Sequence, residues 1–248
     1  IDLAAHSLKD LPTEIAEGLK IGAILERDDP ADMLISKTAG GWEGLPRGAR
    51  VMTGSLRRGA QIKHLRPDVE IAGVRGNVAT RLRKLQEGDA DAVIIASAGL
   101  KRLQLKPQGC TRLDPLVFLP ACGQGAIAVE IRAEDKDAQA LVRIIDDKIT
   151  RQAVMAEREY LRFLHGGCSA PVGAYARIEK EFMVIDAILA DIDGSQVIRS
   201  SQRGPADQAE LLGRNAAEDI IRAGGGKILR NLKKDIACLL YTSPSPRD

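Results

Sequence analysis

The sequence is poor in aromatic residues, has no long apolar run and carries no paired-cysteine motif. Aromatic side chains make up 3% of the 248 residues, which argues against the base-stacking surface of a single-stranded nucleic-acid binder. No apolar run approaches the ~18 residues that a membrane-spanning helix needs. The four cysteines have no CxxC spacing, so we expect no disulfide framework, no structural zinc site and a reducing compartment.

Charge of one sign is not in excess either. Lys plus Arg number 36 and Asp plus Glu number 34, which leaves a formal net charge of +2. The total therefore gives no support to a general polyanion-binding role. Hydrophobic residues at 44% and charged residues at 28% are ordinary globular usage, and the length suits one large domain or two to three small ones.

The two ends of the chain differ from the rest. The residues Ile1 to Ala5 resemble a strand already under way, with no initiator Met, so we expect a fragment cut within a domain. The lack of a targeting segment then says nothing about location. Residues 238–248 share none of the helical periodicity before them and resemble the translation of a sequencing adapter. A natural disordered tail is the alternative.

From residue 50 onward, short β-rich runs alternate with helical patterns. We expect strands at 50–52, 69–74 and 92–96, and helices at 56–65, 78–86 and 100–103. Strands that alternate with helices indicate βαβ units on a parallel sheet, with ligands at the carboxyl ends of the strands.

Beyond Pro120 the pattern changes class. We expect a strand at 126–131, a long helical stretch at 137–164, strands at 172–178, 182–190 and 196–200, and a helix at 206–223. Asp193-Gly194 supplies a hairpin turn, and three glycines from Gly224 onward are expected to stop the last helix. This part predicts a small α+β domain.

Positive charge is concentrated locally. Residues 47–84 hold ten basic and two acidic side chains. Thr53, Ser55, Arg57 and Arg58 stand where a strand gives way to a helix, so backbone N–H groups and hydroxyls point at one spot. With Arg75 after the next strand and Arg81 in the following helix, they predict an anion site suited to carboxylate or phosphate. The alternative, a solvated basic face, is accepted for three others: Arg66, Arg83 and Lys84.

Two other segments are suited to chemistry. In His6-Ser7-Leu8-Lys9-Asp10, a carboxylate beside a lysine follows a strand and suits a general acid, a base or a stabiliser of a cation. An Asp there is also a common helix cap, and His6 is equally a structural histidine. In Gly166-Gly167-Cys168, a cysteine on a glycine turn suits covalent attachment, whereas a small buried thiol is the more common outcome.

Five motifs in order carry a resemblance: HSLKDLP, TGSLRR, VRGNVATRL, LPACGQGA and GGCSAPVGAYA. They resemble the porphobilinogen deaminase (hydroxymethylbilane synthase) family, from Ile1 to about Lys234. The resemblance implies that the family's N-terminal portion is missing, so we expect the chain as written to be inactive.

The resemblance implies an α/β fold with two doubly wound lobes like those of type-II periplasmic binding proteins, the first one incomplete, and a small C-terminal α+β domain. Residues 1–27 and 123–147 would be the remnant of domain 1. Domain 2 would span 28–122 and domain 3 148–237, with 238–248 as a non-native tail.

The activity that the resemblance implies is the joining of four porphobilinogen molecules head to tail, with release of ammonia, to give linear hydroxymethylbilane for haem and chlorophyll synthesis. The primer is a dipyrromethane cofactor held by a thioether to the residue that matches Cys168. Asp10 matches the catalytic aspartate, which hydrogen-bonds pyrrole N–H groups and stabilises the cationic azafulvene.

The remaining implied site residues divide into two groups. Matches to cofactor-binding residues are Lys9, Thr53, Ser55, Arg57, Arg58 and Arg75. Matches to substrate-binding residues are Ser7, Arg81 and Gln124. Gly54 stands where some members have Ser, and Cys122 is given no role.

The resemblance also implies a cytoplasmic monomer that acts on a small molecule, with no metal, nucleic-acid or membrane partner; an organelle transit peptide stays open. The competing hypothesis is a binding module that captures an organic anion without chemistry. It explains the arginines but not Asp10 and Cys168 together, and a covalent dipyrrole adduct in the intact mass would favour the enzyme.

Overall fold

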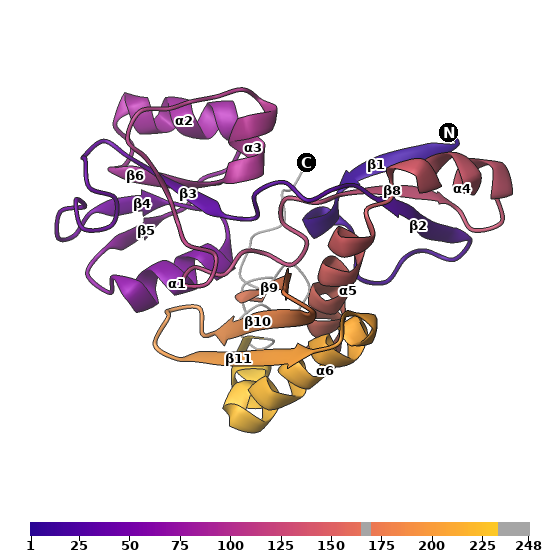
Figure 1. The fold of residues 1–248 in the computed structure, drawn as a ribbon. Coiled ribbons are helices and arrows are strands. Elements are labelled where there is room, and N and C mark those ends of the chain that lie inside the picture. The colour runs from indigo at the N-terminus through magenta and orange to yellow at the C-terminus, as the bar shows by residue number, and fades with distance from the viewer. Residues whose placement is uncertain (165–169, 233–248) are drawn as a thin grey trace, which may run out of the picture.

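The computed structural model describes residues 1–164 and 170–232. Within these ranges the strands form three separate sheets. Figure 1 shows helix α5 (Lys148–Phe163) between two of these sheets. In the described ranges no helix combines the length and apolar character that crossing a bilayer requires.

The first sheet brings the start of the chain beside a segment that returns much later. Its order is β1 (Leu3–Ser7), β8 (Ile127–Arg132), β2 (Leu19–Ile24), and both pairings are antiparallel. Helix α4 (Lys136–Val142) packs on one face. On the other face, Leu8, Leu11 and Val154 of α5 share an apolar cluster, so the end of β1 is fixed against α5. Strand β2 was not predicted.

The second sheet has helices on both faces. Its order is β5 (Glu70–Ala72), β4 (Arg50–Met52), β6 (Ala92–Ala96), β3 (Asp32–Ser36), β7 (Cys110–Arg112). Helix α1 (Leu56–Leu65) packs through Ile62 on one face, and α2 (Val78–Glu87) and α3 (Ser97–Arg102) pack on the other. This is the doubly wound lobe that was expected.

Two strands that the sequence pattern did not predict, β3 and β7, join the predicted parallel ones. Strand β4 is parallel to β5 and β6, as predicted, but β3 is antiparallel to both β6 and β7. The sheet is therefore mixed. Strands β3 and β7 are short and flank the crossings between lobes, so neither belongs to a strand-helix-strand repeat that the sequence pattern would reveal.

The third sheet is an antiparallel meander covered by two helices. Strands β9 (Val172–Glu179), β10 (Phe182–Ala190) and β11 (Val197–Gly204) pack against α5 and α6 (Ala209–Ile220). The predicted hairpin turn is confirmed, with Gly194 at φ +73°. The predicted stop at the glycine run is confirmed: Gly224 lies at φ +107°, outside the helical region, and kinks the chain. A second helical segment follows it through residue 232.

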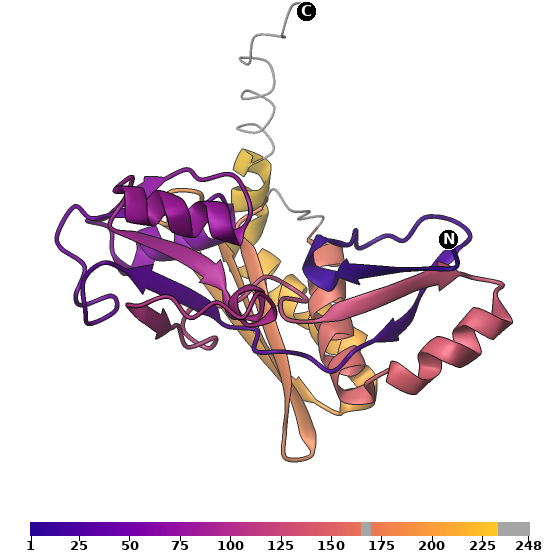
Figure 2. The same cartoon turned by 90° about the horizontal axis from the view of Figure 1, so that it is seen from above.

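Two chain crossings join the first two sheets, and the view from above shows those sheets as separate lobes (Figure 2). The first crossing leads from β2 to β3 and the second from β7 to β8. Both pass α5, where the buried carboxylate of Glu157 accepts bonds from Arg27 of the first crossing and from the backbone N–H of Gly123 in the second. A single helix therefore fixes the meeting point of the three sheets.

Candidate active site

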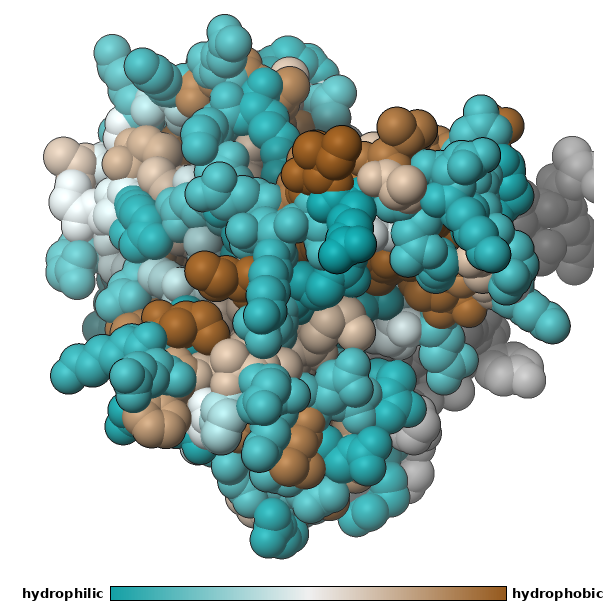
Figure 3. Space-filling view, turned by 45° about the vertical axis from the view of Figure 1, so that its right-hand side comes forward, coloured by the Kyte–Doolittle hydropathy of each residue, from teal (hydrophilic) through white to brown (hydrophobic). Residues whose placement is uncertain are grey.

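Two cavities lie side by side where the three sheets meet. Figure 3 shows one face of the molecule, on which hydrophilic surface is interrupted by several hydrophobic patches. The first, of about 330 Å³, is lined from the end of β1, the start of α1 and the third domain, including Leu161, Ala170 and Val172. The second, of about 360 Å³, is lined from the end of β1, the start of α2 and helix α3. Five residues line both and form the wall that the cavities share: Lys9, Asp10, Arg58, Arg81 and Gln124.

Asp10 and Lys9 belong to a 3-10 turn, Leu8–Asp10, directly after β1. The turn is anchored because Leu8 is buried and its N–H donates to the carbonyl of Ala126 over 3.0 Å. Asp10 is exposed and caps none of the described helices, so the capping alternative has no support. Burial, followed by the positive charge of Arg58, lowers the pKa of Lys9.

His6 lies beside a carboxylate of the first sheet. Its Nε2 lies 3.3 Å from Oε2 of Glu130 on the neighbouring strand β8. His6 lines neither of the two cavities.

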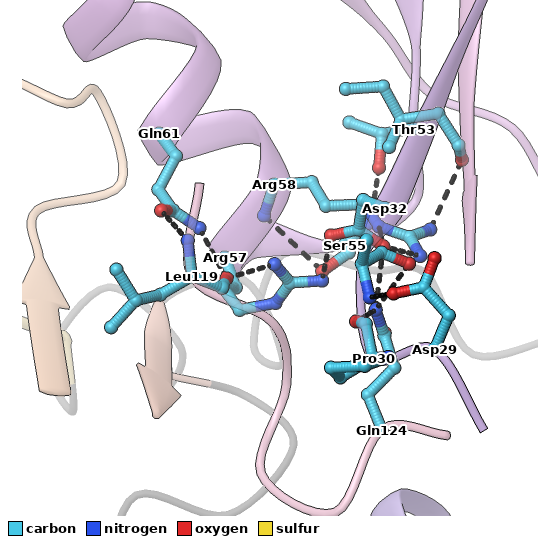
Figure 4. Close-up of polar contacts among 12 residues, drawn as sticks. Asp29, Pro30, Asp32, Thr53, Ser55, Arg57, Arg58, Gln61, Leu119 and Gln124 are labelled. Carbon is cyan, nitrogen blue, oxygen red and sulfur yellow. Dashed lines mark hydrogen bonds and ion pairs between the residues drawn. The ribbon is translucent and has the colours of Figure 1, made fainter. Parts of the chain in front are cut away.

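Arg57 and Arg58 are both buried at the start of α1 and share one carboxylate, that of Asp32 (Figure 4). Arg57 Nη2 lies 2.9 Å from Asp32 Oδ2, and Arg58 Nη2 lies 2.6 Å from Asp32 Oδ1. Burial by itself raises the pKa of Asp32, but the two guanidinium groups outweigh it and hold that pKa well below its ordinary value. The arginines thus line the cavities as a cluster with an internal counter-ion.

The network continues into the second crossing through Gln124. Its Nε2 donates to the carbonyl of Pro30 over 2.7 Å and to Asp32 Oδ1 over 2.9 Å, which fixes the orientation of the amide. Three atoms of the cluster are buried without a hydrogen-bond partner in the described structure: Gln124 Oε1, Arg57 Nε and Asp32 Oδ2. Because Asp32 Oδ2 is ion-paired with Arg57, one acceptor and one donor remain for a ligand.

The hydroxyl residues of TGSLRR lie at different depths. Ser55 lines the first cavity and caps α1, its side chain accepting from the N–H of Arg58. Thr53 is buried below it, and its Oγ1 accepts from the N–H of Ser55 over 3.1 Å. Thr53 therefore supports the cap and does not line either cavity.

The other predicted residues are divided between the second cavity and the surface. Ser7 lines the second cavity, and Arg81 lies on the shared wall, where its Nε donates to the carbonyl of Gly76 over 2.9 Å. Burial, followed by the charge of Arg58, lowers the pKa of Arg81. Arg75 is exposed in the turn before α2 and lines neither cavity.

The cysteines differ in what the structure describes. Cys168 lies outside the described residues, although Ala170, two positions later, lines the first cavity. Cys122 lines the same cavity, and burial raises the pKa of its thiol well above the ordinary range, which makes it a poor nucleophile. No cluster of three or more metal-ligating side chains occurs within residues 1–164 and 170–232.

Sequence reasoning missed three polar residues at the site. Asp32 and Glu157 are fully buried carboxylates, and Arg102 lines the second cavity while donating to the carbonyl of Gly125 over 2.9 Å. Arg102 lies within the helix predicted at 100–103, whose sequence gave no sign that it faces a cavity. No sequence pattern marks a carboxylate that a fold will bury between arginines.

The walls of the two cavities combine cations with one accessible carboxylate. Positive charge comes from Lys9, Arg57, Arg58, Arg81 and Arg102, and negative charge from Asp10 and Asp32. Five cations against two anions leave a local excess of +3. Such a site suits a ligand with several carboxylates that develops positive charge beside Asp10.

Comparison with known families decides the identity. The family model "Porphobilinogen deaminase, dipyromethane cofactor binding domain" matches residues 1–140, and "Porphobilinogen deaminase, C-terminal domain" matches residues 151–222. The chain belongs to the porphobilinogen deaminase family. Named relatives agree: the enzyme of Syntrophobacter fumaroxidans is 45% identical over 94% of this chain and 75% of its own length. That of Desulforudis audaxviator is 47% identical over the same shares.

Solved structures with partial similarity include a putative methionine-binding lipoprotein from Bacillus subtilis, with a TM-score of 0.36, 14% identity, and coverage of 54% of this chain and 63% of that chain. Similarity at that TM-score is slight, and the α/β fold class follows from the sheet topology above. As a porphobilinogen deaminase, the chain is a hydroxymethylbilane synthase, a transferase of tetrapyrrole biosynthesis whose cofactor is dipyrromethane.

The donors around the first cavity fit that cofactor. A dipyrrole that carries acetate and propionate groups needs several cationic or N–H donors, and Lys9, Arg57 and Arg58 line the cavity together with Ser55. The unpartnered Arg57 Nε is a further buried donor among the described residues. The chemistry of the donor set therefore agrees with the group that the family carries.

Proposed function

We propose that the shared wall is the catalytic centre, with the cofactor in the first cavity and the incoming porphobilinogen in the second. Lys9, Ser55, Arg57 and Arg58 would hold the cofactor, which would be attached at Cys168. Ser7, Arg81 and Gln124 would bind the substrate. Support comes from the lining: Ser55 and Arg57 line only the first cavity and Ser7 only the second. The other four, Lys9, Arg58, Arg81 and Gln124, lie on the wall that both cavities share. Thr53 acts through Ser55, and Arg75 remains a proposed ligand from the surface turn.

The observation that carries this proposal is the position of Asp10 on the wall common to both cavities. A group there faces the junction at which the two molecules would be joined. When bound, the cofactor supplies the pyrrole carbon to which the first substrate is added.

The cations of the wall bind and orient the carboxylates of both molecules. Each charge-assisted hydrogen bond contributes about 1.5–3 kcal/mol. Because Asp32 fixes Arg57 and Arg58 from below, they need little reordering to receive a carboxylate. Gln124 Oε1, an acceptor without a partner in the described part of the chain, is suited to accept from a pyrrole N–H.

Asp10 opposes the charge that appears as ammonia leaves. The carbon–nitrogen bond of the protonated aminomethyl group breaks and its electron pair departs with the nitrogen as neutral ammonia. The positive charge stays on the pyrrole, which becomes an azafulvene cation. An ionised carboxylate already in place stabilises that cation without reorganisation, which is worth about 10²–10³ in rate.

We also propose a monomer that works in the cytoplasm on small molecules alone. The near-zero net charge and the scarcity of aromatic residues support the absence of a nucleic-acid partner.

The proposal is tested with Asp10→Asn and Asp10→Glu. Activity is measured on the completed enzyme, meaning this chain joined to the parts of the Syntrophobacter relative that lie outside the match. We expect Asp10→Asn to lower porphobilinogen turnover about 10²–10³-fold with unchanged thermal melting, and Asp10→Glu to retain more activity because it keeps the charge. The control is Asp89→Asn, an exposed carboxylate in the turn after α2. Turnover of Asp10→Asn at the parent rate would refute the role.

A further inference from the structure

Helix α5 carries three consecutive buried charges, Glu157, Arg158 and Glu159. Glu159 pairs with Arg162 and Arg214, which leaves the first two to be explained. Neighbouring residues on a helix point in different directions, and these two bind different segments. Glu157 binds Arg27 and two backbone N–H groups, those of Gly123 and Ala176. Arg158 pairs with no carboxylate of the described residues, and its bonds all go to backbone carbonyls. A buried cation without a paired anion lowers the stability of the fold. The burial of Arg158 therefore calls for an explanation.

The carbonyls that Arg158 binds directly follow Asp10 in the chain. Nη1 donates to Leu11 over 3.2 Å, and Nη2 donates to Pro12 over 2.6 Å and to Thr13 over 3.2 Å. Between the 3-10 turn and β2 the chain has no regular secondary structure. The guanidinium group therefore supplies the hydrogen bonds that these carbonyls would accept from backbone N–H groups in a strand or helix.

The Asp10 carboxylate depends on its backbone for its position. It has no hydrogen-bond partner among the described residues, and its side chain is exposed to the cavities. Leu8 and Leu11 pack against Val154 of α5, and Arg158 lies one helical turn beyond Val154. The apolar contacts hold the turn on one side, and Arg158 holds the chain on the other side of Asp10.

We propose that Arg158 is a positioning residue of the reaction. By holding the carbonyls of residues 11–13 to α5, it sets the place of the Asp10 carboxylate relative to the turn that carries Gln124, which Glu157 fixes to the same helix. The inference rests on the proposed catalytic role of Asp10.

The first test compares Arg158→Met and Arg158→Lys with Arg162→Met in the completed enzyme. Methionine keeps the apolar part of the side chain but has no hydrogen-bond donor. Lysine keeps the positive charge but lacks the planar set of N–H donors of a guanidinium group. Arg162 lies one turn further along α5, is exposed, and lines the same neighbouring cavity of about 320 Å³ as Arg158. A misplacement of about 1 Å can cost 10²-fold in rate. We therefore expect Arg158→Met to lower kcat about 10- to 10²-fold with KM within about 2-fold, Arg158→Lys to recover part of it, and Arg162→Met to match the parent.

A double-mutant cycle separates positioning from a structural role. If Arg158 acts through Asp10, adding Arg158→Met to Asp10→Asn lowers single-turnover rates by less than about 2-fold, because the group being positioned is already neutral. An additive loss, or a parent-like kcat in Arg158→Met, would overturn the inference. If Arg158→Met does not fold, the same cycle is measured with Arg158→Lys, alone and with Asp10→Asn, and is decided by the same two outcomes. A parent-like rate in Asp10→Asn alone would instead remove the proposed function.

Discussion

Replacing Asp32 with Asn removes the counter-ion that Arg57 and Arg58 share. The carboxylate is fully buried, with ion-pair distances of 2.9 and 2.6 Å and a third bond from Gln124. Asn keeps the volume and one acceptor but leaves two buried guanidinium groups facing each other without a negative charge.

Breaking a buried ion pair on one side costs about 3–5 kcal/mol of the free energy of unfolding. For a chain of this length, 1 kcal/mol moves the melting temperature by about 2–4 °C, so we expect a fall of roughly 6–20 °C. The control is Asp28→Asn, which removes an ion pair with Lys101, a largely exposed side chain. Exposed ion pairs contribute little to the free energy of unfolding. The melting temperature of this variant should therefore be close to that of the parent.

The pH dependence gives an independent measure of the same pair. The pKa of Asp32 is lower in the folded state than its ordinary value. The stability it contributes is therefore complete above the unfolded-state pKa of about 3.9 and is lost as the pH falls toward the folded-state pKa. Asp32→Asn should flatten the acid side of the stability curve. A melting temperature within about 2 °C of the parent, with the same acid dependence, would refute this reasoning.

Two further substitutions test how the domains are joined. Glu157→Gln leaves the largely buried Arg27 without its anion and should lower the free energy of unfolding by about 3–5 kcal/mol, as measured by urea titration. An unchanged midpoint would argue against the role of α5 as a common frame. Gly194→Ala places a Cβ 2.5 Å from the carbonyl oxygen of Ala60, so the hairpin should separate from α1 and limited proteolysis should accelerate. The control Gly48→Ala has a similar φ of +76° with open space around it, and equal proteolysis of both variants would attribute the effect to backbone strain alone.

Much of the fold was predictable because its signals are local. Strand β6 is an apolar run of five residues, α1 and α2 each follow a side chain that caps them, and the Asp193-Gly194 turn sets the register of β10 and β11. The antiparallel insertion of β3 was missed because its direction is decided by the crossings between lobes, which involve contacts far apart in the sequence.

The site was predictable where residues follow strands and unpredictable where charges are buried. Lys9 and Asp10 come directly after β1, so strand and motif together indicate their place. The burial of Arg57 and Arg58 against Asp32 was not foreseen, since the partners are separated by 25 and 26 positions. Arg158 was hidden for the same reason: a basic residue in an amphipathic helix ordinarily belongs to the solvated face.

The most direct test of the central claim follows enzyme-bound intermediates by intact mass after one addition of porphobilinogen. The completed enzyme should carry the dipyrromethane adduct at the start and then gain successive pyrrole units. Asp10→Asn, loaded with the same cofactor, should remain at the mass of the adduct on that time scale, because its wall still binds carboxylates but no longer opposes the developing cation. If Asp10→Asn gains pyrrole units at the parent rate, the wall between the two cavities is not where the reaction is catalysed.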